Sequence, residues 1–247
     1  MKIFKWIGII VFMSEKNVVE KELEKHQQVP EKHIVKRTYF FEIYLAVTIA
    51  GFGLLATLAK QNPYFGFDLL ITRTIQQIAI PGFDPLMKFI TTMGNFEWGI
   101  ATIIVLLATF VMVRKNINAF FLLVSVVGTE TISVFFKGLI SRPRPDPGLI
   151  NQFGSYIYSD SFPSGHVLFY IGCYGFLLYL TFSKLKHGGL RTALLIILSA
   201  LLVLIGISRI YVGAHWFSDT LGAYLIGSVW LFVVIHLYAK FAPKKNE

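Results

Sequence analysis

The stretch "TALLIILSALLVLIGI" (residues 192–207) contains no charged residue. As an α-helix that rises about 1.5 Å per residue, it nearly crosses the apolar core of a bilayer, which is about 30 Å thick. Polar and apolar residues do not alternate along it, as they would along a strand of a membrane barrel. The stretch therefore predicts a transmembrane helix.

Similar apolar runs lie on both sides of this stretch, at residues 43–59, 98–113, 117–136, 167–182 and 221–239. Of the 247 residues, 55% are hydrophobic and 15% are charged, whereas soluble domains carry roughly 25% charged residues. We therefore expect an all-α fold, a bundle of six transmembrane helices in one domain over residues 39–240.

Charged segments flank this domain. Residues 1–38 are expected to form an N-terminal arm that is interfacial or partly disordered, and residues 241–247 a cytoplasmic tail. The arm begins with "MKIFKWIGIIVFM", which resembles the start of a signal peptide but is followed by no small-residue cleavage site. A true start at Met13 and a short interfacial anchor beginning at Met1 are both open interpretations.

The formal net charge is +9. The basic residues gather in the arm, in the connections at 114–116 and 184–191, and at the C-terminus. Basic loops beside apolar runs are typical of the cytoplasmic side of a membrane protein, so the charge predicts topology rather than nucleic-acid binding. We therefore expect a multi-pass protein of the cell membrane. Its segments outside the cytoplasm are expected to be residues 60–96, 137–165 and 208–219.

Residues 67–79 of the first outer segment, "FDLLITRTIQQIA", form an amphipathic pattern. The apolar residues fall on one helical stripe, which consists of Phe67, Leu70, Ile71, Ile75 and Ile78. Asp68 and Arg73 fall elsewhere. The pattern predicts an interfacial helix after the first span; a helix that merely caps the bundle is the alternative.

The outer segments also hold most of the unusual polar residues. Lys137, Arg144 and Arg209 would place three cations at the outer ends of apolar runs, against the charge bias of the other loops. Arginine binds phosphate oxygens bidentately and lysine binds them as a point charge. Ser164 and Gly165 come directly before an apolar run, where the unpaired N–H groups of a helix start attract anions. We therefore expect a phosphate site.

Histidines supply reactive groups for the same site. His215 and Asp219 are four residues apart and share a helix face, so the carboxylate can orient an attacking imidazole. His166, on another segment, can protonate a leaving oxygen. Zinc is the alternative, but the His-Glu-x-x-His pattern is missing and Cys173 is the only cysteine.

A resemblance rests on the combined spacing of these residues. The motifs are Lys137-x6-Arg144-Pro145, Pro163-Ser164-Gly165-His166 and Ser208-Arg209-x5-His215-x3-Asp219. They resemble the three-part signature of the type 2 phosphatidic acid phosphatase superfamily, which includes bacterial lipid phosphatases and the vanadium-dependent haloperoxidases. A haloperoxidase is not expected, because those relatives are soluble and this chain is apolar.

The resemblance implies a role for each signature residue. His215 would attack phosphorus and form a phosphohistidine, Asp219 would support it, and His166 would act as general acid. The phosphate oxygens would be bound by Lys137, Arg144, Arg209, Ser164 and the Gly165 amide. The resemblance implies no metal and no cofactor. Arg142 lies outside the signature, and we assign it no catalytic role. Glu130, inside an apolar run, is either a functional carboxylate or hydrogen-bonded between helices; we favour the structural role.

The resemblance further implies an integral-membrane lipid phosphatase whose site faces away from the cytoplasm. Undecaprenyl pyrophosphate and phosphatidylglycerophosphate resemble the substrates of bacterial relatives, so the expected partners are a lipid phosphate or diphosphate and the membrane lipids. The alternatives are a phosphotransferase that uses the same site and a non-enzymatic protein that binds or transports lipid. A non-enzymatic protein would not need His215 and Asp219 beside His166.

Overall fold

A computed structural model of the chain describes residues 31–154 and 160–242, with side chains from residue 41 onward. The described residues contain helices and no strand, which confirms the all-α prediction. The elements are α2 (Glu31–Gln61), α3 (Gly66–Gln76), α4 (Phe83–Met93), α5 (Phe96–Met112), α6 (Asn116–Ile140), α7 (Gly165–Tyr170), the π-helical turn η1 (Ile171–Gly175), α8 (Phe176–Lys184), α9 (Gly189–Tyr211) and α10 (Phe217–Phe241).

The predicted apolar runs all lie in these helices. Within the described residues, five helices or continuous helix sets are long and apolar enough to cross a membrane: 41–61, 116–140, 165–184, 189–211 and 217–241. The remaining run lies in α5, which has 17 residues and joins α4 at a bend of 66°. If that bent pair forms one span, the described residues contain the six predicted spans. Helix α4 itself was not predicted.

The two flanking segments are only partly described. Helix α2 begins at Glu31, within the predicted arm and well before the apolar run at 43. The rest of the arm, with both candidate starts, and residues 243–247 of the predicted tail lie outside the described residues.

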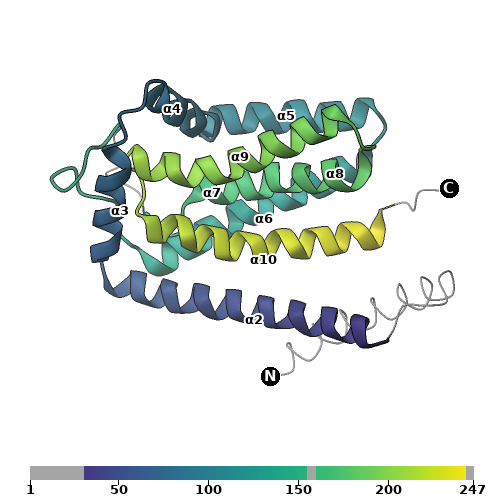
Figure 1. The fold of residues 1–247 in the computed structure, drawn as a ribbon, viewed down its shortest axis with the longest axis horizontal. Coiled ribbons are helices and arrows are strands. Elements are labelled where there is room, and N and C mark those ends of the chain that lie inside the picture. Colours follow the sequence, from purple (N-terminus) through teal and green to yellow (C-terminus); the bar gives the residue numbers. More distant parts are fainter. Residues whose placement is uncertain (1–30, 155–159, 243–247) are drawn as a thin grey trace. The chain divides into compact units, whose positions relative to one another are not determined.

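The chain divides into a unit that ends at Val47, of which the first part of α2 is described, and a unit from Thr48 onward. In the second unit, α6, α8, α9 and α10 lie side by side (Figure 1). Their apolar side chains form one core with α7, in which Leu122, Leu168 and Ile205 are fully buried. Each helix buries its apolar face against the apolar faces of its neighbours, which is how helices form a core.

Helix α6 and the π-helical turn pack especially closely. A Cβ atom on Gly172 would come within 2.5 Å of the Thr129 hydroxyl, so only glycine fits there. The Ser125 hydroxyl donates a hydrogen bond of 2.7 Å to the Gly172 carbonyl. The contact holds the middle of the α7–η1–α8 span against the middle of α6.

Helix α3 crosses the ends of α9 and α10 (Figure 1). Its apolar stripe is not its buried face: Phe67 and Leu70 are exposed, while Asp68 and Thr72 are fully buried against the bundle. Exposed apolar side chains suit a helix at a membrane surface. Asp68 lies outside the predicted apolar stripe, and the pattern did not predict its burial, which its partners described below explain.

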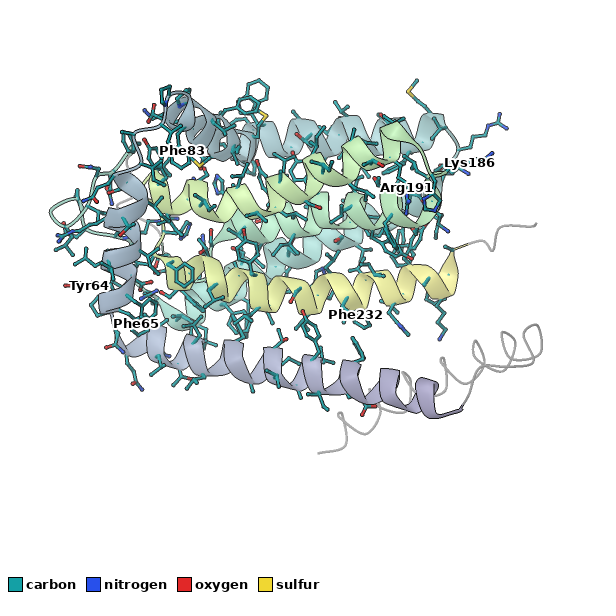
Figure 2. The ribbon with its side chains drawn as sticks, in the orientation of Figure 1. Tyr64, Phe65, Phe83, Lys186, Arg191 and Phe232 are labelled. Carbon is teal, nitrogen blue, oxygen red and sulfur yellow. The ribbon has the colours of Figure 1, made fainter. Side chains whose placement is uncertain are left out.

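The three predicted outer segments meet at this end of the bundle. Arg73 of α3 donates a hydrogen bond of 3.1 Å to the Leu149 carbonyl, and Gln76 donates one of 2.9 Å to the Tyr211 carbonyl. Figure 2 shows Tyr64 and Phe65 at this end and Lys186 and Arg191 at the opposite end. The basic connection between α8 and α9 therefore lies far from the segments that carry the phosphatase-like motifs.

Candidate active site

The signature residues lie at helix ends on the α3 side of the bundle. Lys137 is in the last turn of α6 and Arg209 in the last turn of α9. Ser164 is the N-cap of α7, and Asp219 is in the first turn of α10. Because α6 and α9 end where α7 and α10 begin, residues from four helices converge on one place.

The cations converge on His215, which lies between α9 and α10. Nη1 of Arg144 is 3.3 Å from Nε2 of His215 and donates a hydrogen bond of 2.8 Å to the Ala214 carbonyl. Lys137 and Arg209 are close enough to act electrostatically on the same imidazole. The structure therefore brings all three predicted phosphate-binding cations around the predicted nucleophile.

His215 is buried at 1% exposure. Burial first, and then Arg144, Arg209 and Lys137, hold the pKa of His215 well below its ordinary value. The neutral imidazole that results has a lone pair available at one nitrogen. Nδ1 lies 3.6 Å from Oδ2 of Asp219, so the carboxylate faces the nitrogen opposite the cations. Nε2 is thus the nitrogen that is directed into the cationic cluster.

Asp219 is held by its own helix and by a buried arginine. Its Oδ2 accepts a hydrogen bond of 2.9 Å from the Trp216 N–H, one of the unpaired donors at the start of α10. Its Oδ1 lies 2.5 Å from Nη1 of Arg142. The structure places Arg142 behind the carboxylate, on the side away from His215.

Ser164 and Gly165 form the start of α7 as predicted. The Ser164 hydroxyl is fully buried and has no hydrogen-bond partner among the described residues. A Cβ atom on Gly165 would lie 3.0 Å from the Ser133 hydroxyl and 3.7 Å from Nζ of Lys137. A small residue here leaves room beside the lysine, and a phosphate oxygen would satisfy the buried hydroxyl.

His166 contacts the turn between α4 and α5. Its Nε2 is 3.1 Å from Oδ1 of Asn95, and Gly94 packs directly against the ring. The same turn region holds Arg209, whose Nη1 donates a hydrogen bond of 2.5 Å to Thr91. The sequence motifs did not identify Thr91, Gly94 or Asn95, because no local pattern links them to residues 71 to 118 positions away.

Glu130 lies on α6 with Lys137 as an electrostatic partner, and its side chain is exposed at the surface of the bundle. The functional carboxylate and the structural role, which we favoured, both stay predictions for this residue.

A cavity of about 1,020 Å³ opens beside the cationic cluster. Lys137, Arg144, Pro145 and Trp216 are among its lining residues, together with Tyr64 from the segment that precedes α3. Ligand cavities in proteins commonly measure about 300–1,000 Å³. The cavity has room for a phosphate together with the polar part of a lipid. Within the described ranges, no three His, Cys, Asp or Glu side chains are grouped as metal ligands would be.

Comparison with known proteins agrees with this geometry. The family model of the PAP2 superfamily matches residues 118–243, more than half of the chain. Phosphatidylglycerophosphatase B of Bacillus subtilis is 29% identical over 188 residues, which cover 74% of this chain and 89% of the relative.

Solved structures show the same fold. The crystal structure of a transmembrane PAP2 type phosphatidylglycerolphosphate phosphatase from Bacillus subtilis matches with a TM-score of 0.69 and 25% identity, over 82% of this chain and 98% of that one. The structure of Aquifex aeolicus LpxE matches with a TM-score of 0.54 and 23% identity, over 70% and 96% of the two chains.

Proposed function

Because the chain belongs to the PAP2 superfamily, we propose that it is an integral-membrane lipid phosphatase that works through a phosphohistidine on His215. The observation that carries this proposal is the placement of His215, with Asp219 at one ring nitrogen and Arg144 at the other. A buried neutral imidazole directed into a cationic cluster can attack an anionic phosphorus centre, because the cations bind the charge that builds up on the oxygens.

The reaction proceeds in two displacements. Nε2 of His215 forms a bond to phosphorus while the bond from phosphorus to the leaving oxygen breaks, and His166 donates a proton to that oxygen. Asp219 stabilises the cationic phosphoimidazole. Water then attacks phosphorus and gives a proton to His166, while the bond from phosphorus to Nε2 breaks. The products are inorganic phosphate and neutral His215.

Phosphatidylglycerophosphate is the substrate we favour, because it is the compound named for both Bacillus subtilis relatives. It is a phosphomonoester, and its head group fits the volume of the cavity beside Lys137 and Arg144. Undecaprenyl pyrophosphate, a diphosphate, is the second candidate, because one cationic cluster can bind either terminal phosphate.

The site faces away from the cytoplasm in this proposal. Its support is the distribution of charge: the basic connection with Lys186 and Arg191 lies at the end of the bundle opposite α3 (Figure 2), and basic loops mark the cytoplasmic side. The lipid head group would then be presented in the outer leaflet.

The test measures phosphate release by detergent-purified protein from phosphatidylglycerophosphate, undecaprenyl pyrophosphate and phosphatidic acid. Wild type is expected to release phosphate and His215→Ala is expected to release none above background. His187→Ala is the matched control, because His187 is exposed in the connection between α8 and α9, and it should retain wild-type rates.

Three outcomes would contradict the proposal. Phosphate release by His215→Ala at the wild-type rate would remove His215 from the mechanism. Binding of these lipids without release by wild type would identify a lipid-binding protein instead. Transfer of phosphate to an added alcohol, in preference to water, would identify the phosphotransferase alternative.

A further inference from the structure

Arg142 lies between two carboxylates at the end of the bundle that α3 crosses. Its Nη1 is 2.5 Å from Oδ1 of Asp219, and its Nη2 is 3.1 Å from Oδ2 of Asp68. All three side chains are fully enclosed, with at most 1% of each residue exposed. Buried charges are costly unless they are paired, so this cluster of two acids and one base needs a reason.

Asp68 joins α3 to the first turn of α10. Its Oδ1 accepts a hydrogen bond of 2.8 Å from the Ser218 N–H, and its Oδ2 accepts one of 2.7 Å from the Ser218 hydroxyl. The Ser218 hydroxyl in turn accepts a hydrogen bond of 2.7 Å from Arg142. Asp68 therefore holds the residue that directly precedes Asp219 as well as the arginine that holds the Asp219 carboxylate.

We propose that Asp68 and Arg142 are positioning residues, which fix the Asp219 carboxylate against the His215 imidazole and keep the buried cluster negatively charged. This inference rests on the proposed role of His215. Neither residue reaches the phosphate site; both act through Asp219.

Charge balance explains why two acids are needed. Arg142 and Asp219 alone would sum to zero charge, and Arg142 would weaken the attraction between Asp219 and a cationic imidazole. Asp68 adds a second negative charge, so the three side chains together carry one net negative charge. That charge faces an imidazole that becomes cationic when phosphorus is bound to Nε2, and a low-dielectric interior makes the attraction strong.

Geometry supplies the second contribution. The Asp219 carboxylate could rotate about its side-chain bond if only the Trp216 N–H held it. Arg142 fixes Oδ1, which leaves Oδ2 facing Nδ1 of His215. A catalytic group misplaced by about 1 Å can lose roughly 100-fold in rate.

The experiment compares Asp68→Asn with wild type in kcat, KM and the pH profile of phosphate release from phosphatidylglycerophosphate. We expect kcat to fall roughly 10- to 100-fold with KM changed less than about threefold. The acid limb of kcat/KM should move to lower pH, because loss of a negative charge disfavours the protonated imidazole. The charged and titratable groups that face His215 from other elements, Lys137, Arg144, His166, Asp219 and Arg209, are unchanged in this variant.

Asp84→Asn is the matched control. Asp84 is a partly exposed carboxylate that pairs with Lys88 at 2.9 Å, and its loss should leave kcat and the acid limb at wild-type values. An unchanged kcat and acid limb in Asp68→Asn would overturn the proposal. So would a lower kcat without a shifted limb in a protein with a lowered melting temperature, because that is the result of a merely structural role.

Ser218→Ala decides the question if Asp68→Asn does not fold. It keeps every charge and the direct ion pair between Asp68 and Arg142, and it removes only the hydroxyl that accepts from Arg142 and donates to Asp68. The Asp219 carboxylate is then less firmly held, so kcat should fall several-fold at constant KM with no shift of the acid limb. Wild-type kcat in Ser218→Ala would then overturn the proposal. Failure of the proposed function is distinguishable, because in that case wild type itself releases no phosphate.

Discussion

Replacing Gly94 with alanine tests whether the turn between α4 and α5 places the His166 imidazole. The backbone of Gly94 has φ −94° and ψ −1°, which alanine adopts without strain. The new Cβ atom, however, would lie 2.7 Å from Cδ2 of His166 and 3.1 Å from Cε2 of Tyr170. Tyr170 is anchored by a hydrogen bond of 2.7 Å from its hydroxyl to the Ile90 carbonyl, so the imidazole is the group that must move.

The size of the movement follows from ordinary contact distances. Carbon atoms pack at about 3.5 Å or more, so the His166 ring must withdraw by about 0.8 Å. Because a displacement of about 1 Å can cost roughly 100-fold, we expect kcat for a lipid phosphate to fall about 30- to 100-fold. The loss should be confined to reactions that need a proton on the leaving oxygen, since His166 is the proposed general acid.

The assay therefore compares two leaving groups. An alkoxide leaves poorly without a proton, whereas the nitrophenolate of p-nitrophenyl phosphate leaves unaided, so Gly94→Ala should lose less than about fivefold on the aryl substrate. Gly53→Ala is the control, because a Cβ atom on Gly53 meets nothing within 4 Å. Wild-type turnover of lipid by Gly94→Ala, or equal losses on the two substrates, would refute the reasoning.

Further predictions concern the nucleophile, the metal requirement and the sidedness. Asp219→Asn should lower kcat by roughly 10³- to 10⁴-fold in a folded protein, because the phosphoimidazole loses its counter-charge; turnover within tenfold of wild type would contradict this. The lowered pKa of His215 keeps the imidazole neutral, so the acid limb of kcat/KM should lie below pH 6.5 and activity should be lost only as pH falls through that lowered pKa; a limb above pH 6.5 would argue against His215 as the nucleophile. Activity should persist in excess EDTA and be inhibited by vanadate, because cations and a helix start supply the charge stabilisation of a metal; loss in EDTA that zinc restores would indicate a metallophosphatase. In intact cells, with Cys173 replaced, an impermeant maleimide should label a cysteine at the exposed Asn151 but not one at Asn116; the reverse pattern would place the site in the cytoplasm.

The helices that cross the membrane could be predicted because each needs only its own composition. The run at 192–207 has no charge and must be buried in lipid or protein wherever it lies. Helix α4 was not predicted because its 11 residues are too few to form a long apolar run. It is held in the fold by its contact with α9, which the local sequence does not show. The 66° bend after α4 lies at Gly94 and Asn95, which contact His166. Because His166 is distant in the sequence, the local pattern does not indicate this bend.

The candidate site was predictable only where its residues sit within recognisable motifs. Asp68 falls outside the apolar stripe of α3, and an amphipathic pattern alone does not indicate that such a residue is buried. Its burial depends on Arg142, which lies 74 residues away and is also outside the signature. Sequence patterns report neighbours along one helix, whereas this cluster is assembled from three segments that meet only in the folded protein.

The π-helical turn divides the span from Gly165 to Lys184 into two helical parts whose side chains are rotated relative to each other. A π turn closes its hydrogen bonds one residue later than an α turn, so every side chain after it is offset by about 100° from an uninterrupted helix that starts at Gly165. The π turn therefore sets the rotation of α7, which begins after Ser164 and carries His166, relative to α8. The His166 side chain of α7 faces the phosphate site, and the side chains of α8 face their own neighbours in a different rotational register. Removing one residue from 171–175 would realign the two halves and turn one of them by more than a quarter of a revolution.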